Sequence, residues 1–223
     1  MARSRPPDRF AALIAVATVS FVRAGVRRVQ MDELARGLGV AKGTLYLYVE
    51  SKEALFDACL RWARDPQPPA TLPVPTPSEA DTLGFVRRVA ATEARLATLD
   101  TPDTPIDDVL AELYDRLDRN GTLLKLIAGS AVDWPELGAV WYAETRDAVI
   151  GRVERWIAGE PRLRAGLEPR STARLVVETA TWFAVHRRWD PGSDDPIPDA
   201  IARETALTAL HHVLTEAPCP TRS

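Results

Sequence analysis

The chain has 223 residues, of which 46% are hydrophobic and 26% are charged, and its formal net charge at pH 7 is −3. This composition is typical of a globular protein and excludes a disordered chain. No apolar run approaches the ~18 residues of a membrane span and no export-type segment opens the chain, so we expect a cytoplasmic protein without a membrane partner.

Charge is divided unevenly along the chain. Residues 1–64 hold 11 Lys and Arg against 6 Asp and Glu, a net charge of +5, whereas the remainder holds 17 against 25, a net charge of −8. This split favours an N-terminal part that meets a polyanion. Chance scatter of solvated charges is the alternative interpretation.

Apolar residues recur at helical spacing and alternating strand patterns are scarce, so the sequence predicts an all-α fold. Before residue 65 the pattern predicts four helices: Phe10–Phe21, Met31–Leu38, Ala41–Tyr48 and one that begins after Ser51. Gly25 is placed to supply the left-handed residue that follows the first helix. Ser51 is a typical N-cap for the fourth.

A proline-rich segment separates these helices from the rest of the chain. Residues 65–78 contain six prolines, which forbid a continuous helix. We therefore divide the chain into residues 1–64, a linker at 65–78, a C-terminal domain at 79–215 and a tail at 216–223. The linker either lines the mouth of a pocket or crosses the surface.

Six further helices are predicted beyond the linker, several with a proline in the first turn, where its missing N–H leaves no bond unmade. They are expected at Ser78–Leu99, Pro105–Arg119, Thr122–Ala128, Pro135–Ala158, Pro169–Trp189 and Pro198–Leu214.

Residues 30–52 predict two short helices joined by a glycine-containing turn, the pattern of a helix-turn-helix whose second helix enters the major groove of DNA. Leu34, Leu38 and Leu45 have the spacing of inward-facing residues. The outward side then presents hydrogen-bond donors for phosphate oxygens and a glycine that permits close backbone approach, namely Lys42, Gly43, Thr44, Tyr46, Tyr48 and Lys52.

The segment has two alternative interpretations. Gly37 and Gly39 open like a dinucleotide-binding fingerprint, but the third glycine would stand at Lys42 and no strand precedes the run. A generic helical hairpin with solvated Lys and Thr side chains is the other alternative.

The run Gly-Val-Ala-Lys-Gly-Thr-Leu-Tyr-Leu-Tyr-Val-Glu-Ser-Lys-Glu-Ala-Leu at 39–55 resembles the signature of the TetR family of bacterial transcriptional regulators. Gly25 and the Asp-Glu-Leu-Ala run at 32–35 also stand where that family has its own. The resemblance covers roughly residues 9–60. It implies an N-terminal three-helix helix-turn-helix DNA-binding domain followed by a C-terminal helical bundle for ligand binding and dimerisation.

The resemblance also implies roles for single residues. Lys42, Gly43 and Thr44 are expected on or near base edges, and Tyr46 and Tyr48 on backbone phosphates. At the start of the fourth helix, Lys52 is expected to bring its charge and the helix N-terminus to another phosphate.

Gln30 completes the expected DNA-contact set, at the start of the second helix. Both Gln30 and Ala41 replace the Ser or Thr that often caps these helices in the family, so each cap is expected to be weaker by about 1 kcal/mol. Val49 replaces a frequent Phe. These departures affect the transfer of base preference and leave the phosphate contacts in place.

The C-terminal part contains five of the six tryptophans. Such rings usually fill a core, and an apolar ligand cavity between helices is the alternative. We expect a pocket lined by Phe85, Tyr114, Trp141, Trp182 and His186.

The helix around residues 174–189 is apolar over more than half of its circumference, so it must bury two faces. With the last helix as its companion it predicts an isologous four-helix homodimer interface, which the resemblance also implies. A single large core that covers both faces is the alternative. The expected interface residues are Val176, Ala180, Phe183, Ala206, Leu210 and Val213.

The sequence has few residues that could bind a metal or form a disulfide. Cys59 and Cys219 belong to no paired motif, so we expect free thiols, with Cys59 in a core. His211 and His212 are adjacent and cannot face one ligand from the same side of a helix. We therefore expect no metal and no cofactor.

Together these patterns predict a ligand-responsive, dimeric DNA-binding regulator: a repressor released from a palindromic double-stranded operator by a small, largely apolar effector. The alternative is a helical-bundle carrier or enzyme that binds no DNA. Neither a Gly-x-Ser-x-Gly elbow nor a glycine-rich phosphate loop is present, so we expect no enzyme activity.

Overall fold

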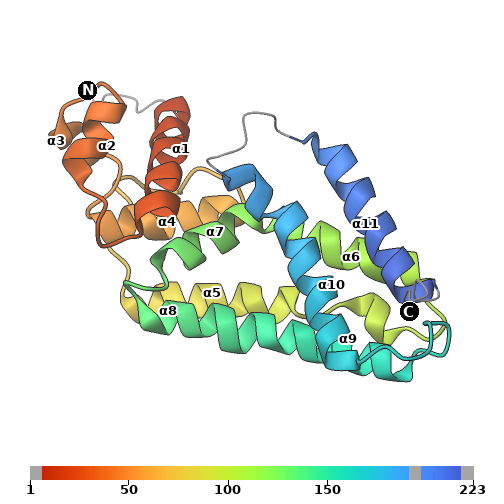
Figure 1. The fold of residues 1–223 in the computed structure, drawn as a ribbon. Coiled ribbons are helices and arrows are strands. Elements are labelled where there is room, and N and C mark those ends of the chain that lie inside the picture. The colour runs from red at the N-terminus through yellow and green to blue at the C-terminus, as the bar shows by residue number, and fades with distance from the viewer. Residues whose placement is uncertain (1–6, 191–196, 217–223) are drawn as a thin grey trace. The chain divides into compact units, whose positions relative to one another are not determined.

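The computed structural model describes residues 7–190 and 197–216, and there the chain is nearly all helical, which confirms the predicted fold class (Figure 1). The α-helices are α1 (Pro7–Ala24), α2 (Met31–Gly37), α3 (Lys42–Leu45), α4 (Lys52–Arg64), α5 (Glu79–Glu93), α6 (Ile106–Arg119), α7 (Gly121–Ser130), α8 (Pro135–Ala139), α9 (Asp147–Gly159), α10 (Pro169–Ala184) and α11 (Asp199–Thr215). Two 3-10 turns, Ala97–Asp100 and His186–Trp189, and a π-helical stretch, Val140–Arg146, are the remaining helical elements of these ranges.

Parts of two predictions fall outside this description. Residues 217–223 of the expected tail, with Cys219, lie outside the described residues. Within the described ranges, no helix has both the length and the apolar character that crossing a membrane requires.

Long predicted helices are interrupted where side chains take over backbone groups. The helix expected at 78–99 ends at Glu93, because the N–H groups of Ala97 and Thr98 donate to the Glu112 carboxylate at 3.1 and 2.8 Å. The helix expected at 169–189 ends at Ala184, and the Arg187 guanidinium donates to a carbonyl of its last turn. Hydrophobic spacing continues through both breaks, so it gives no sign of them.

The chain forms two compact units. The first comprises Met1–Ala90 and Thr122–Tyr142, and the second comprises Ala91–Gly121 and Ala143–Ser223. Thus α7 and α8 belong almost wholly with the N-terminal helices, although they follow them by some 30 residues. The functional boundaries expected at 64 and 78 remain a prediction, because spatial compactness does not test them.

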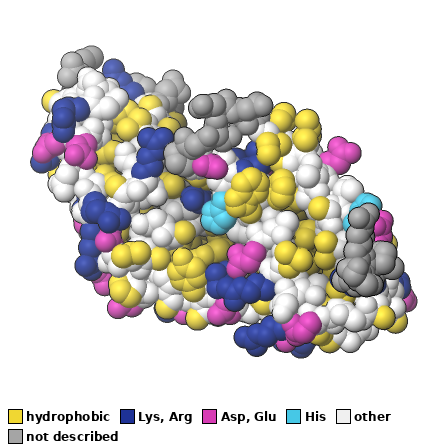
Figure 2. Space-filling model, in the orientation of Figure 1, with side chains coloured by type: hydrophobic (Ala, Val, Ile, Leu, Met, Phe, Trp, Pro, Cys, Tyr) yellow, Lys and Arg dark blue, Asp and Glu magenta, His cyan; other side chains and the backbone are white. Residues whose placement is uncertain are grey.

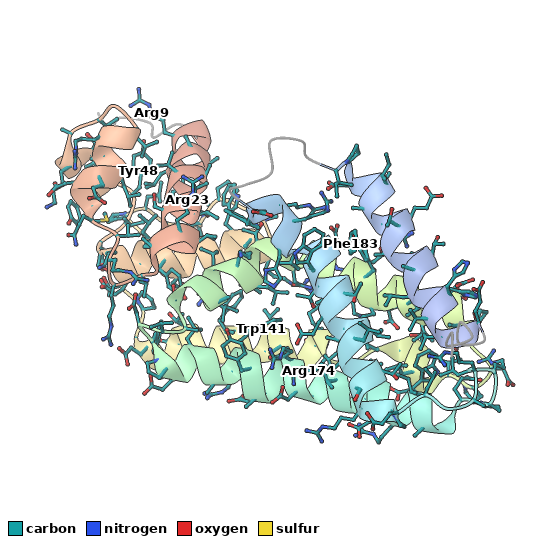
Figure 3. The ribbon with its side chains drawn as sticks, viewed as in Figure 1. Arg9, Arg23, Tyr48, Trp141, Arg174 and Phe183 are labelled. Atoms are coloured by element: carbon teal, nitrogen blue, oxygen red, sulfur yellow. The ribbon has the colours of Figure 1, made fainter. Side chains whose placement is uncertain are left out.

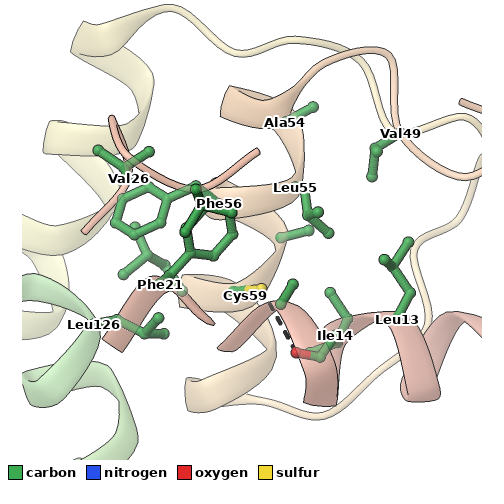
Figure 4. Close-up of a cluster of buried hydrophobic side chains, with 14 of the residues drawn as sticks. Leu13, Ile14, Phe21, Val26, Val49, Ala54, Leu55, Phe56, Cys59 and Leu126 are labelled. Carbon is green, nitrogen blue, oxygen red and sulfur yellow. Dashed lines mark hydrogen bonds between the residues drawn. The ribbon is translucent and has the colours of Figure 1, made fainter. Parts of the chain in front are cut away.

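One apolar core holds the first unit together, built on α1 and α4 (Figure 4). Phe21 and Phe56 meet edge to face with ring centroids 5.2 Å apart. Cys59 is fully buried, as expected, and its Sγ lies 3.9 Å from the Ile14 carbonyl oxygen. Burial raises the pKa of the Cys59 thiol to about 12, so the sulfur is a neutral packing group at physiological pH.

The junction of α1 and α7 depends on a close backbone approach. Gly25 ends α1 with the predicted left-handed conformation, at a φ of +78°. A Cβ at this position would lie 2.7 Å from the Gly129 carbonyl oxygen and 2.7 Å from Asp133 Oδ2. The Val26 N–H donates to Ser130 Oγ at 3.2 Å. Only glycine satisfies both the backbone angle and the space at Gly25.

The second unit is a bundle in which α6, α9, α10 and α11 share one apolar core. The face of α10 that carries Val176, Val177 and Ala180 is fully buried there, as are Leu210 and Leu214 of α11. The core is therefore complete on one side of α10, and the other side of that helix is left for a different role.

Candidate nucleic-acid interface

The helices α2 and α3 form the expected helix-turn-helix. The turn between them passes through Gly39, whose φ is +65°, and the Val40 N–H donates to the Ala35 carbonyl at 3.0 Å. Leu34 and Leu45 are buried and pack the pair into the core of the first unit. These contacts hold α3 at a fixed angle to α2.

Capping differs between the helices of the motif. Gln30 stands at the N-cap of α2 and Ala41 at the N-cap of α3, and neither side chain makes a capping hydrogen bond. At the start of α4, by contrast, Ser51 Oγ accepts a hydrogen bond from the Ala54 N–H at 3.0 Å. The weak caps and the Ser51 cap are both confirmed, and α4 therefore has the best-satisfied N-terminus of the three.

The outward side of α3 is polar and open. Lys42 and Gly43 are exposed, Thr44 is half-buried, and Tyr46 retains 41% of its exposure. A Cβ built on Gly43 would meet no atom within 4 Å, so the backbone there is accessible to a large partner. Leu47, which the sequence reasoning did not select, is also exposed next to Tyr46.

Each lysine of the predicted set has a nearby oxygen. Lys42 Nζ lies 3.2 Å from Asp32 Oδ2 of α2, and the two side chains are 50% and 62% exposed. Lys52 Nζ donates to the Arg27 carbonyl at 3.0 Å. An exposed ion pair such as Lys42–Asp32 contributes about 1 kcal/mol or less, so a DNA phosphate can compete for the Lys42 ammonium group. The partner of Lys52 is a neutral carbonyl, and a charged phosphate is the stronger acceptor.

Tyr48 does not belong to the outward set. Its side chain is only 5% exposed, and its ring centroid lies 6.5 Å from that of Phe10 in α1 (Figure 3). Because α3 ends at Leu45, the helical spacing that placed Tyr48 outward no longer applies to it. The prediction of an outward Tyr48 is therefore wrong, and this residue packs the helix-turn-helix against α1.

Residues 13–59 match the family model described as bacterial regulatory proteins, tetR family. The N-terminal helix-turn-helix is a tetR-family DNA-binding domain.

The fold of the whole chain is similar to those of solved regulators. The ketosteroid transcriptional regulator KstR2 of Mycobacterium tuberculosis is 16% identical, with a TM-score of 0.54 and coverage of 97% of this chain and 100% of that chain. The probable transcriptional regulatory protein RHA5900 is 18% identical, with a TM-score of 0.53 and coverage of 94% and 100%. At these identities the likeness shows the fold. No curated protein matches the sequence.

The tetR-family domain carries further cations that the sequence reasoning missed. Arg9 and Arg23 are exposed on α1 (Figure 3). Arg27 and Arg28 are exposed in the loop before α2. The Arg27 carbonyl is the group that Lys52 contacts, so these two residues are neighbours. A basic doublet directly before a helix-turn-helix is the signal that would have found them.

The predicted effector-pocket residues are divided between the two units. Phe85 and Trp141 are half-buried in the first unit, where the Arg61 guanidinium carbon stands 4.7 Å from the centre of the Phe85 ring. Trp182 and His186 are exposed in the second unit. The pocket as a whole remains a prediction.

Tyr114 is the fifth residue of that set and has an unusual environment. It is 2% exposed in the second unit, and its hydroxyl is buried with no hydrogen-bond partner among the described residues. Burial raises the pKa of this hydroxyl, and the nearby Arg187 guanidinium offsets part of the rise through both its charge and its hydrogen-bonding N–H groups. Among the described residues, no three His, Cys, Asp or Glu side chains are grouped so as to hold a metal ion.

The expected dimer-interface residues face inward. Val176, Ala180, Ala206 and Leu210 are each at most 2% exposed within the second unit, and all but Ala206 belong to its apolar core. Side chains already covered within one chain cannot meet a second copy, so the assignment of these four residues is wrong. Phe183 and Val213 are half-buried.

The opposite face is the uncovered one. Leu175 and Trp182 of α10 are 48% and 43% exposed, and Ile201 of α11 is 53% exposed. Hydrophobic side chains are visible on the surface over these helices in Figure 2. A helical wheel reveals two apolar faces of a helix, but only the packing shows which one is covered within the chain.

Proposed function

We propose that this protein is a dimeric repressor of transcription that leaves its operator when a small, largely apolar effector binds. The observation that carries the proposal is the outward row of donors on α3 and at the start of α4, within a tetR-family DNA-binding domain. The basic balance of residues 1–64 supports the same function, because a polyanion is attracted by it.

The contacts divide into two kinds. Lys42, Gly43 and Thr44 reach base edges in the major groove, with Gln30 beside them, and Tyr46 and Lys52 hold backbone phosphates. Lys52 stands in the first turn of α4, so the positive end of that helix adds to its charge. Tyr48 has no contact with DNA in this proposal.

The test is a salt titration of DNA binding. Lys52→Ala should weaken binding about equally on all sequences and reduce the slope of log K against log salt by about one, because one phosphate contact is lost. Arg64→Ala, which removes a cation at the other end of α4, is the matched control and should leave the slope unchanged. An unchanged slope in Lys52→Ala would contradict the phosphate role.

Dimerisation is proposed through the uncovered face of α10 and α11. Leu175 and Trp182 are seven residues apart and share one side of α10, and Ile201 lies on the neighbouring α11. Two DNA-binding domains joined in a two-fold dimer bind successive major grooves when their recognition helices are spaced by about 34–36 Å or a multiple of it.

A charge placed in this face tests the interface. Trp182→Glu should give monomers in sedimentation at concentrations where the natural chain is dimeric, because an unpaired carboxylate cannot be buried cheaply. Val132→Glu alters an exposed apolar residue of the first unit, 83% exposed, and should leave the dimer intact. A dimer that survives Trp182→Glu would refute this choice of face.

The effector is proposed to hydrogen-bond with the Tyr114 hydroxyl, a buried polar group that lies near the Arg187 side chain but makes no hydrogen bond of ordinary geometry among the described residues. Burying such a group unpaired costs free energy, which a ligand oxygen or nitrogen would recover. To empty the operator, the effector must prefer the released state by several kcal/mol.

A further inference from the structure

The proline-rich segment does not leave the DNA-binding domain after α4 but returns to it. Val74 and Val49 form a parallel β-bridge. Its two hydrogen bonds run from the Val74 N–H to the Tyr48 carbonyl, 2.8 Å, and from the Glu50 N–H to the Val74 carbonyl, 3.0 Å. Val49 is fully buried, and Val74 packs against the same core. The bridge therefore ties the segment to the turn at 46–51 that joins α3 to α4.

Side chains extend this contact to the start of α4. The Thr76 N–H donates to Glu50 Oε2 at 3.0 Å, and the Thr76 hydroxyl donates to Ser51 Oγ at 2.8 Å. Ser51 Oγ is the atom that caps α4 by accepting from the Ala54 N–H. Thr76 thus contacts the residue directly before Lys52.

The sequence of the segment suits this task. In Pro73-Val74-Pro75-Thr76-Pro77 the prolines have no N–H and hold extended backbone angles, so ordering the segment costs little entropy. Val74 and Thr76 supply the only backbone N–H groups of the run. Both are donated to the turn between α3 and α4.

The far end of the segment is anchored as well. Ser78 and Asp81 exchange hydrogen bonds at the start of α5, from Ser78 Oγ to Asp81 Oδ2 and from the Asp81 N–H to Ser78 Oγ. One turn later the Thr82 hydroxyl donates to the buried Asp57 carboxylate of α4 at 2.9 Å. The run of prolines is therefore held at one end by the turn at 46–51 and at the other by the contact between α4 and α5.

We propose that residues 73–77 are a positioning strap, in which Val74 and Thr76 act through the turn at 46–51 to hold Tyr46 and Lys52 where they meet phosphates. The strap itself does not touch DNA. This inference rests on the proposed DNA binding, and it adds positioning residues from outside the helix-turn-helix.

The experiment compares DNA binding by Thr76→Val and Thr76→Ser in the full chain. Thr76→Val keeps the shape and the N–H but removes the hydroxyl, so we expect binding about threefold weaker, within the range for loss of one hydrogen bond. Thr76→Ser restores the hydroxyl and should restore the affinity. Thr71→Val, in the same segment but outside the strap, is the matched control and should bind as the natural chain does.

Two further readouts separate positioning from mere stability. The salt slope should stay unchanged in Thr76→Val, because the number of phosphates bound is the same, and the free energy of unfolding should fall by no more than the loss of one exposed hydrogen bond, about 1 kcal/mol. Hydrogen exchange of the Glu50 and Val74 amides should accelerate in Thr76→Val alone. A Glu50 variant would not isolate the strap, since removing its charge would itself favour DNA binding.

The outcomes are distinct. Equal affinity of Thr76→Val and the natural chain, or a Thr76→Ser variant as weak as Thr76→Val, would overturn the strap while leaving DNA binding intact. A natural chain that binds no DNA would instead refute the proposed function, and the exchange rates of Glu50 and Val74 would still decide whether the strap holds the turn.

Discussion

The first unit presents its candidate functional groups on the surface, whereas the second unit covers most of its own. On the first, Lys42, Gly43 and Tyr46 stand outward from a packed helix-turn-helix. In the second, ion pairs such as Arg203 with Asp115 join neighbouring helices, and the distinctive features are an uncovered apolar face and the buried hydroxyl of Tyr114. A recognition motif for a polyanion can thus be local, while the binding properties of a bundle depend on which faces its packing leaves open.

Substitution of Gly25 is the strongest test of the packing in the first unit. We expect Gly25→Ala to destabilise the chain by about 3 kcal/mol or more, because left-handed strain adds to a backbone collision. Gly39→Ala has a similar positive φ but open space for its Cβ, so it should cost only about 1 kcal/mol. Urea unfolding of both variants measures the difference, and equal losses would contradict the close approach of α1 and α7.

The ion pairs of the second unit are tested at Glu112. Although partial burial opposes it, hydrogen bonds from Thr98 and Arg116 lower the pKa of Glu112 to about 2. The carboxylate therefore stabilises the fold above its ordinary pKa, and this contribution is lost as pH falls from about 4.5 toward 2. Glu112→Gln should cost up to about 3 kcal/mol at pH 7.

The pH profile is the decisive part of that test. The difference in unfolding free energy between Glu112→Gln and the natural chain should shrink steadily below pH 4.5. Glu136→Gln, at an exposed position of α8, is the control and should show little difference at any pH. A constant difference for Glu112→Gln would mean that packing, and not charge, makes its contribution.

The buried hydroxyl of the second unit is tested by Tyr114→Phe. Removing an unsatisfied buried group should leave the chain as stable or more stable, by about 1 kcal/mol, and should abolish the response to an effector that uses it. Tyr46→Phe, at an exposed tyrosine of the first unit, should leave stability unchanged. A large loss of stability in Tyr114→Phe would show that its hydroxyl is satisfied.

The smallest expected effect is a change in DNA binding caused by a substitution on the surface of the first unit. Asp32→Asn should strengthen DNA binding about twofold to threefold at low salt, because Lys42 loses its competing partner. Glu33→Gln removes a neighbouring exposed carboxylate of α2 that is not paired with Lys42 and serves as the control. Weaker binding by Asp32→Asn would mean that Asp32 orients Lys42 for its contact.

The helix-turn-helix could be predicted because its determinants are local. The left-handed Gly25, the Ser51 cap and the apolar spacing of Leu34 and Leu45 all act within a few residues, and each has the predicted geometry. The prediction for Tyr48 was wrong because α3 ends at Leu45, and helical spacing no longer determines which way a side chain points in the turn that follows.

The remaining features depend on contacts far apart in the sequence. Helical spacing showed that α10 has two apolar faces, but it did not show which of them is buried within the chain. The dimer interface was therefore predicted on the face that packs against Leu210 and Leu214 of α11. The prolines of the linker predict an extended backbone, yet nothing in them identifies Val49 as the partner of Val74. The break before α6 likewise depends on Glu112, whose carboxylate binds backbone N–H groups about 15 residues earlier in the chain.

The central claim, that paired copies of the α3–α4 surface bind a duplex, is tested most directly by selecting bound DNA from a random pool with the full chain. The account predicts enrichment of an inverted repeat whose half-sites are one helical turn apart, or a multiple of it, with binding that weakens steeply as salt rises. Recovery of no common sequence, together with retention on DNA that does not depend on salt, would contradict it.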